Sequence, residues 1–166
     1  MSWVDGMTLA LMALVTVVQT VRGVRAGGMG LPFFEAAGVI VAAVAATSLS
    51  HELAGSLHVN ESTLLLVLFI LLSVLAFVLA RWLFALTALS FQSLDGILSC
   101  LCALVMAWTV GHMFLRIMIG SADSEYVEAI ANSPVAREVL RFRSWHALMR
   151  LLFKAKAGPE IDPGLD

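Results

Sequence analysis

Hydrophobic residues run along this chain in four long blocks, and most charged residues lie between the blocks or after the last one. The clearest block covers residues 62–80 and holds nineteen residues without a charged side chain. About 20 helical residues, each rising ~1.5 Å, span the ~30 Å hydrocarbon core of a bilayer. The block therefore predicts a transmembrane helix.

Three further blocks cover residues 6–21, 31–50 and 96–115, with connections at 22–30, 51–61 and 85–93. The second block carries Glu35 about one turn from its start, which leaves only residues 36–50 free of charge. Fifteen helical residues measure ~22 Å, less than a full span. Either this helix crosses part of the membrane, or Glu35 lies at membrane depth and faces protein.

Composition supports a membrane protein. The 166 residues are 60% hydrophobic and 13% charged, with a mean hydropathy of +0.94, whereas soluble domains hold about 25% charged residues. We expect an all-α, polytopic membrane protein with about four transmembrane helices over residues 1–120. An amphipathic helical tail over 121–157 and a disordered end over 158–166 should follow. The net charge of −2 gives no reason to expect a nucleic-acid partner.

The tail contains three helical patterns. Residues 121–134 predict a short helix that stops before Ser133, and Pro134 suits the first turn of the next helix. Within 144–157, apolar side chains including Trp145 and Phe153 fall on one face, and basic side chains including Arg150 and Lys154 on the other. Such a helix lies on anionic headgroups or packs on the apolar surface of a partner, and the sequence leaves both open.

Small residues recur every four positions in the second and fourth blocks. The two stripes are Gly38, Ala42, Ala46 and Ser50, and Ser99, Ala103, Ala107 and Gly111. Such stripes let another helix backbone approach closely in lipid. We expect the second and fourth helices to form the inner contact and the leucine-rich third helix to face lipid. Whether the stripes meet each other or a second protein is open.

Basic residues in the loops predict the topology. Arg22 and Arg25 lie in the first connection and Arg81 begins the third, whereas the second connection has no lysine or arginine. Positively charged loops stay in the cytoplasm, so both termini should lie outside it. The tail is also basic, but most of its charges lie beyond the ~15–20 residues from a membrane end where the rule applies.

Polar residues in or beside the four blocks are the candidates for chemistry. They are Asp5, Arg22, Glu35, Asp95 and His112. Charges at mid-bilayer are costly, so residues near helix ends are expected to be anchors or caps. Glu35 is the best functional candidate, with Arg22 or Arg25 as its partner. His112 would bond a neighbouring helix, or take part in proton or ligand binding.

The sequence offers little for an enzyme. His51 and Glu52 resemble half of a zinc-protease helix, but Gly55 stands where the second histidine should be. Cys100 and Cys102 are two residues apart on a helix and point ~200° apart, so they do not pair with each other. We expect a non-enzymatic protein with no metal site and no cofactor. Its expected partners are the lipid bilayer and other membrane subunits or a second copy.

Three short motifs, in order, resemble the colicin V production protein family of bacterial inner-membrane proteins. They are Trp3-Val4-Asp5 at the start of the first helix, Arg22-Gly23 after it, and Leu94-Asp95-Gly96 at the start of the fourth. The chain departs from the family at Gly96, where a basic residue is usual, and at Met106, where an arginine is frequent. Ser99, Ala103 and Ala107 replace its usual glycines.

The resemblance implies a role in toxin export or envelope homeostasis in the bacterial inner membrane, with the tail outside the cytoplasm. Together with the residues, it predicts an accessory or scaffold subunit of an export or envelope complex that acts by association. The alternative is a small channel or transporter component with a polar path near Glu35 and His112. A path of this kind needs several polar groups around one cavity at membrane depth.

Overall fold

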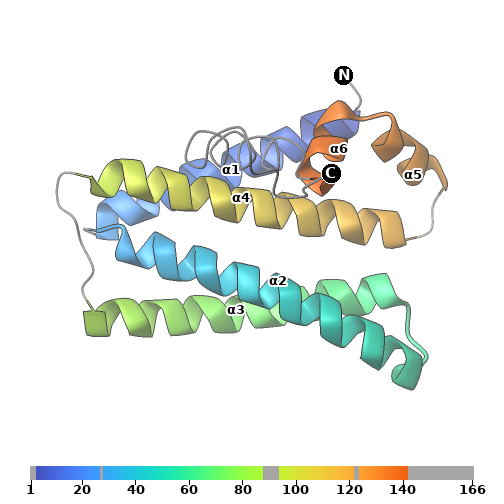
Figure 1. Cartoon of the computed structure of the whole chain (residues 1–166), viewed down its shortest axis with the longest axis horizontal. Coiled ribbons are helices and arrows are strands. Elements are labelled where there is room, and N and C mark those ends of the chain that lie inside the picture. Colours follow the sequence, from blue (N-terminus) through green and yellow to red (C-terminus); the bar gives the residue numbers. More distant parts are fainter. Residues whose placement is uncertain (1–2, 27, 88–93, 122–123, 142–166) are drawn as a thin grey trace, which may run out of the picture.

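The structure is a computed structural model that describes residues 3–26, 28–87, 94–121 and 124–141, and these form six α-helices without a strand. The helices are α1 (Trp3–Ala26), α2 (Gly30–Leu57), α3 (Glu61–Thr87), α4 (Asp95–Gly120), α5 (Ser124–Ala131) and α6 (Pro134–Arg141). Figure 1 shows the four long helices running roughly alongside one another. The tail residues Trp145, Arg150, Phe153 and Lys154 lie outside the described residues.

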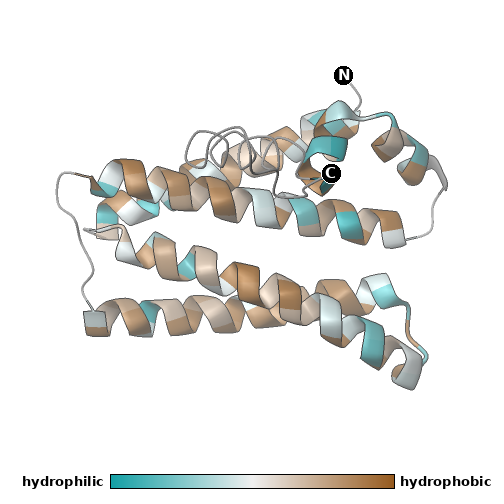
Figure 2. Cartoon of the chain, viewed as in Figure 1, coloured by the Kyte–Doolittle hydropathy of each residue, from teal (hydrophilic) through white to brown (hydrophobic). Residues whose placement is uncertain are grey.

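The four long helices confirm the predicted all-α, multi-pass architecture. They contain 24, 28, 27 and 26 residues, and each is long and apolar enough to cross a membrane. Apolar residues dominate their middle parts, and hydrophilic residues gather toward their ends (Figure 2). The polar tail segments at 124–131 and 134–141 form the two short helices that the sequence predicts.

All three predicted connections are wrong in their first part, because α1 continues to Ala26, α2 to Leu57 and α3 to Thr87. The difference is clearest in the second connection. Residues 51–57 were expected to belong to a polar connection, but α2 continues through them to Leu57. The helix stops at His58, whose backbone takes the left-handed conformation with φ of 55°. A left-handed residue is a common way to end a helix, and loss of hydrophobicity alone does not end one. With 28 residues, α2 measures ~42 Å. It is therefore long enough to span a membrane even if the turn that contains Glu35 is left out.

Helices α2 and α4 lie in the middle of the arrangement. Helix α3 packs mainly on α2, and α1 packs mainly on α4. Between the two inner helices, Met106 of α4 lies with Ala36 and Val39 of α2, and Met113 lies with Ala43 and Ala46. Large methionines thus fill the space that small α2 side chains leave open.

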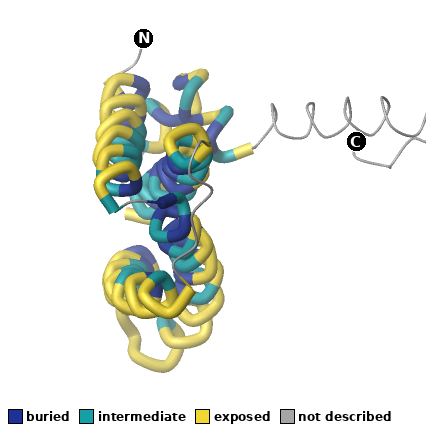
Figure 3. The backbone as a smooth tube through the Cα atoms, turned by 90° about the vertical axis from the view of Figure 1, so that its left-hand side faces the viewer, coloured by how far each residue is buried: buried dark blue, intermediate teal, exposed yellow. Residues whose placement is uncertain are grey.

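The outward surfaces of all four long helices are apolar. Helix α3 is the most exposed, with only Ser62, Leu65 and Ala80 buried. The inner helices also carry exposed apolar side chains, such as Val44 of α2 at 63% and Ile97 of α4 at 64%. Figure 3 shows this pattern, with buried residues on the inside and exposed ones around the periphery. Exposed apolar surface of this extent is expected where lipid, not water, surrounds the protein.

The two short helices fold back over one end of α1 and α4. Ile130 of α5 and Val139 of α6 share a buried cluster with Val4 of α1 and Leu115 of α4. The Tyr126 ring also meets Trp3 of α1 edge-on, with 5.8 Å between ring centroids. Residues 124–141 are therefore packed against the helices that precede them.

Candidate functional site

The small-residue stripes are largely buried, but they do not meet each other at their glycines. Ala42, Ala46 and Ser50 of α2 are buried, as are Ser99, Ala103, Ala107 and Gly111 of α4, and Gly38 is partly buried.

The glycines of the two stripes each pack against an outer helix. A Cβ added at Gly38 would lie 2.9 Å from the Cβ of Ala76 in α3. One added at Gly111 would lie 3.2 Å from Met12 Cγ in α1. Both glycines therefore serve contacts within this chain.

The predicted polar residues form two groups at opposite ends of the bundle. Arg22, Glu35 and Asp95 lie where α1 ends and α2 and α4 begin, whereas Asp5 and His112 lie beside α6. Asp5 and Arg22 are seventeen positions apart in α1, a distance of ~25 Å along the helix. The polar path expected near Glu35 and His112 would have to cross this length.

A buried ion pair forms the centre of the first group. The Arg22 Nη2 donates to Glu35 Oε1 at 2.7 Å. The Glu35 side chain is completely buried and that of Arg22 is 34% exposed. Glu35 thus faces protein, and of its two suggested partners the structure selects Arg22. The charge-assisted contact is short and joins α1 to α2.

Two further contacts extend the ion pair to the other long helices. Gln19 accepts a hydrogen bond from Arg22 Nη1 at 3.2 Å, and its own amide donates to the sulfur of Met106 in α4 at 3.1 Å. The Arg22 guanidinium also lies 5.8 Å from the ring centroid of Phe77 in α3, within cation–π range. We call Gln19, Arg22, Glu35, Phe77 and Met106 the polar junction, since it joins all four long helices.

A close helix approach holds the polar junction in place. Gly23 follows Arg22 in α1, and a Cβ there would overlap Pro32 Cγ and lie 2.7 Å from Ser99 Oγ. Only glycine fits between α2 and α4 at this point. The Arg-Gly pair therefore combines a charged side chain with the close backbone contact that brings it to Glu35.

Asp95 closes the same end of the bundle. Its Oδ1 accepts a hydrogen bond at 3.0 Å from the backbone N–H of Met29, the residue before α2. The first N–H groups of a helix have no partner within the helix, and a carboxylate near them also complements the helix dipole. Asp95 thus ties the start of α4 to the start of α2.

Asp5 plays a similar part at the opposite end. It is completely buried, and its Oδ1 accepts from the Ser133 hydroxyl and, at 3.1 Å, from the backbone N–H of Val135. The Ser133 oxygen in turn accepts from the N–H of Ala136 at 2.9 Å. Ser133 and Asp5 together cap the start of α6, which carries proline at its first position.

His112 belongs to this second group. Its Nδ1 lies 3.3 Å from the backbone carbonyl oxygen of Val139 in α6, so a hydrogen bond requires the proton on Nδ1. The structure places His112 against a neighbouring helix and far from Glu35. Both second-group residues therefore attach α6 to the membrane helices.

The sequence did not single out Gln19, Phe77, Met106 or Ser133 as partners. Gln19 gave one available signal, because it is an uncharged polar residue inside the first apolar block, one turn before Arg22. Met106 and Phe77 gave no such signal, because nothing in the sequence distinguishes one apolar residue from the others in the same apolar block.

The described residues contain no group of three or more histidine, cysteine, aspartate or glutamate side chains placed to hold a metal ion. The Glu35 Oε2 atom is buried and accepts no hydrogen bond from the described part of the chain. The two groups of polar residues attach helices to one another. The first group joins the long helices, and the second holds α6.

No family model matches the chain, and no significant match was found among curated proteins or solved structures.

Proposed function

We propose that this protein is a non-enzymatic accessory or scaffold subunit of the bacterial inner membrane that acts by association with other membrane subunits. The observation that carries the proposal is where the polar and the apolar side chains of the protein lie. The polar candidates Asp5, Arg22, Glu35, Asp95 and His112 bond within the chain at two separated ends, while the outward faces of all four long helices are apolar. Association in the membrane uses close packing of side chains between helices, and it needs no polar path across the protein.

An export or envelope complex is the proposed setting, and the resemblance to the colicin V production protein family supports it. The three motifs that carry the resemblance coincide with the polar attachments. Asp5 caps α6, Arg22 belongs to the polar junction with Gly23 packed beside it, and Asp95 caps α2. In the proposed topology the α1–α2 and α3–α4 connections lie in the cytoplasm and both termini outside, following the arginines near those connections.

The test is purification of the protein from its native membrane in mild detergent, with quantitative mass spectrometry of the subunits that accompany it. Stoichiometric unrelated subunits are expected. A photo-crosslinking residue at the exposed positions Val44 or Leu71 should capture them, and one at the buried position Met113 should not. Recovery of the chain alone, with no crosslinked partner at either exposed position, would refute the proposal.

The conduit alternative is tested in parallel with Glu35→Gln. This variant should leave the complex and its function intact if the protein acts by association. Ion or solute flux in liposomes that requires Glu35, with the complex still assembled, would transfer support to the conduit.

A further inference from the structure

An open groove lies beside the polar junction on the flank of α3. Its lining consists of Arg22, Val74, Phe77, Val78 and Arg81, and its volume is about 310 Å³. The four α3 residues recur at helical spacing, so they form one face of the helix. Val74 and Val78 are exposed, which means that the groove opens sideways toward the surroundings of the helix.

The charges around the groove do not balance. Glu35 neutralises one arginine through its bond to Arg22. Arg81 makes no hydrogen bond or close ion pair with any other residue that the structure describes, and the same Glu35 carboxylate also attracts it. Two arginines and one carboxylate leave one net positive charge at the groove, and an unbalanced charge beside apolar surface is costly.

The donors for an anion are present on both arginines. A guanidinium carries five N–H donors, and the bonds from Arg22 to Gln19 and Glu35 use two of them. Arg22 remains 34% exposed, so its other N–H groups are accessible from the groove. Arginines suit phosphate because their planar donor pairs match two oxygens of the group at once.

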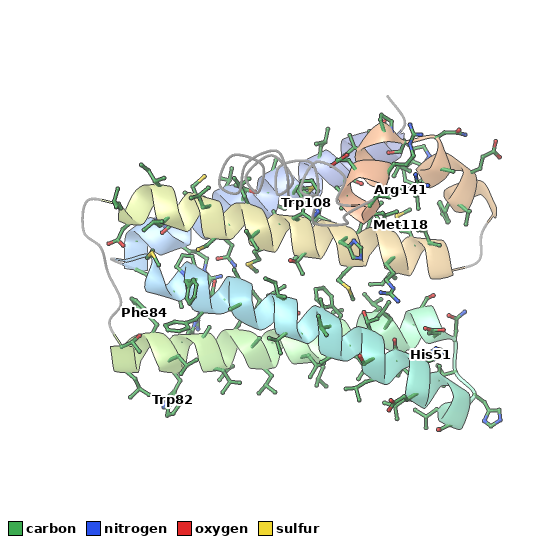
Figure 4. The ribbon with its side chains drawn as sticks, viewed as in Figure 1. His51, Trp82, Phe84, Trp108, Met118 and Arg141 are labelled. Atoms are coloured by element: carbon green, nitrogen blue, oxygen red, sulfur yellow. The ribbon has the colours of Figure 1, made fainter. Side chains whose placement is uncertain are left out.

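The apolar lining extends from the charges toward the middle of α3. Val74 is seven residues from Arg81, ~10 Å along the helix. Trp82, beside Arg81, points away from the bundle (Figure 4) and is 61% exposed, as is typical of a residue at the membrane interface. The groove thus has its charges at the interface and its apolar part at greater depth, as a phospholipid does.

We propose that this groove binds one anionic phospholipid, with its phosphate held by Arg22 and Arg81 and an acyl chain along Val74, Phe77 and Val78. A single phosphodiester charge would balance the net charge of the groove. A zwitterionic lipid would bring a cation for which the groove offers no carboxylate beyond Glu35. Basic pockets at the ends of membrane helices recognise anionic headgroups in this way.

The test is lipid exchange on the purified protein in nanodiscs, followed by native mass spectrometry of the retained lipid. Nanodiscs of equal phosphatidylglycerol and phosphatidylcholine should leave phosphatidylglycerol on the protein. Arg81→Gln should weaken this preference about fivefold, the effect expected for one basic residue near a lipid headgroup. Val78→Trp should reduce retention of either lipid by filling the groove. Arg25→Gln is the matched control, because Arg25 is an exposed arginine at the same end that does not line the groove.

Equal retention of the two lipids by the unmodified protein would overturn the proposal. So would an equal effect of Arg25→Gln and Arg81→Gln, which would indicate a general attraction of anions to this end. Competition by glycerol 3-phosphate as strong as by the whole lipid would also overturn it, since the apolar lining would then contribute nothing. If Arg81→Gln or Val78→Trp removes the lipid and the subunit complex still forms, the lipid site is supported and the proposed association function is unaffected.

Discussion

The buried ion pair at the polar junction predicts an asymmetry between its two members. Replacing Arg22 by methionine leaves the Glu35 carboxylate completely buried without its cation. Removal of one partner from a buried pair costs about 3–5 kcal/mol, and the partial exposure of Arg22 favours the lower end. We therefore expect Arg22→Met to lower the free energy of unfolding by about 3 kcal/mol.

Glu35→Gln should cost less, about 1 kcal/mol, for two reasons. The glutamine oxygen still accepts from Arg22, and the partly exposed arginine can extend its charge toward water or headgroups. The double variant leaves no buried charge, so its cost should fall below the sum of the single costs by about 1 kcal/mol or more.

The assay is reversible unfolding in mixed micelles, followed by circular dichroism as the fraction of denaturing detergent rises. Arg25→Met is the control: Arg25 is exposed and should change stability by less than about 0.5 kcal/mol. The reasoning fails if Arg22→Met costs no more than Glu35→Gln, or if the two single costs add in the double variant.

Three further variants test the helix contacts. Gly23→Ala should destabilise the protein by about 1–3 kcal/mol in the same assay, because its Cβ would overlap Pro32, whereas Gly6→Ala meets nothing within 4 Å and should be nearly neutral. Ser133→Ala should lower stability by about 1–2 kcal/mol and speed proteolysis near the start of α6, since it removes the cap; an unchanged cleavage rate would contradict this role. Gly111→Leu should destabilise the fold of the chain itself, because the new side chain would meet Met12 of the same chain. A variant that runs as a stable folded monomer in native gels would contradict this and indicate that Gly111 contacts another subunit.

The hydrophobic pattern alone was enough to predict the four long helices, and the stop before Ser133 and the proline at position 134 indicated the two short ones. Apolar blocks of this length have few alternatives, because in lipid every backbone polar group needs a partner within its own segment. Helix ends were predicted less well: α2 runs seven residues past the end of its apolar block. Its end depends on a single backbone conformation at His58, which hydrophobicity does not encode.

Burial of Glu35 could be suspected from the sequence, because a carboxylate one turn into an apolar block needs a partner. The sequence left Arg22 and Arg25 as equal candidates, and the packing of Gly23 against Pro32 and Ser99 selects Arg22. Each step of one residue turns the side-chain direction on a helix by about 100°. Which arginine meets Glu35 therefore depends on how α1 is rotated against α2 and α4.

The sequence by itself determined the helical class, the number of apolar spans and the charged residues at their ends, since these follow from local hydrophobicity. Only the tertiary structure decided which polar residues meet. It separates Glu35 from His112, joins Asp5 to Ser133 across more than a hundred residues, and directs the glycines of the two stripes toward the outer helices. Contacts between distant segments depend on the packing of whole helices, and no local pattern records that packing.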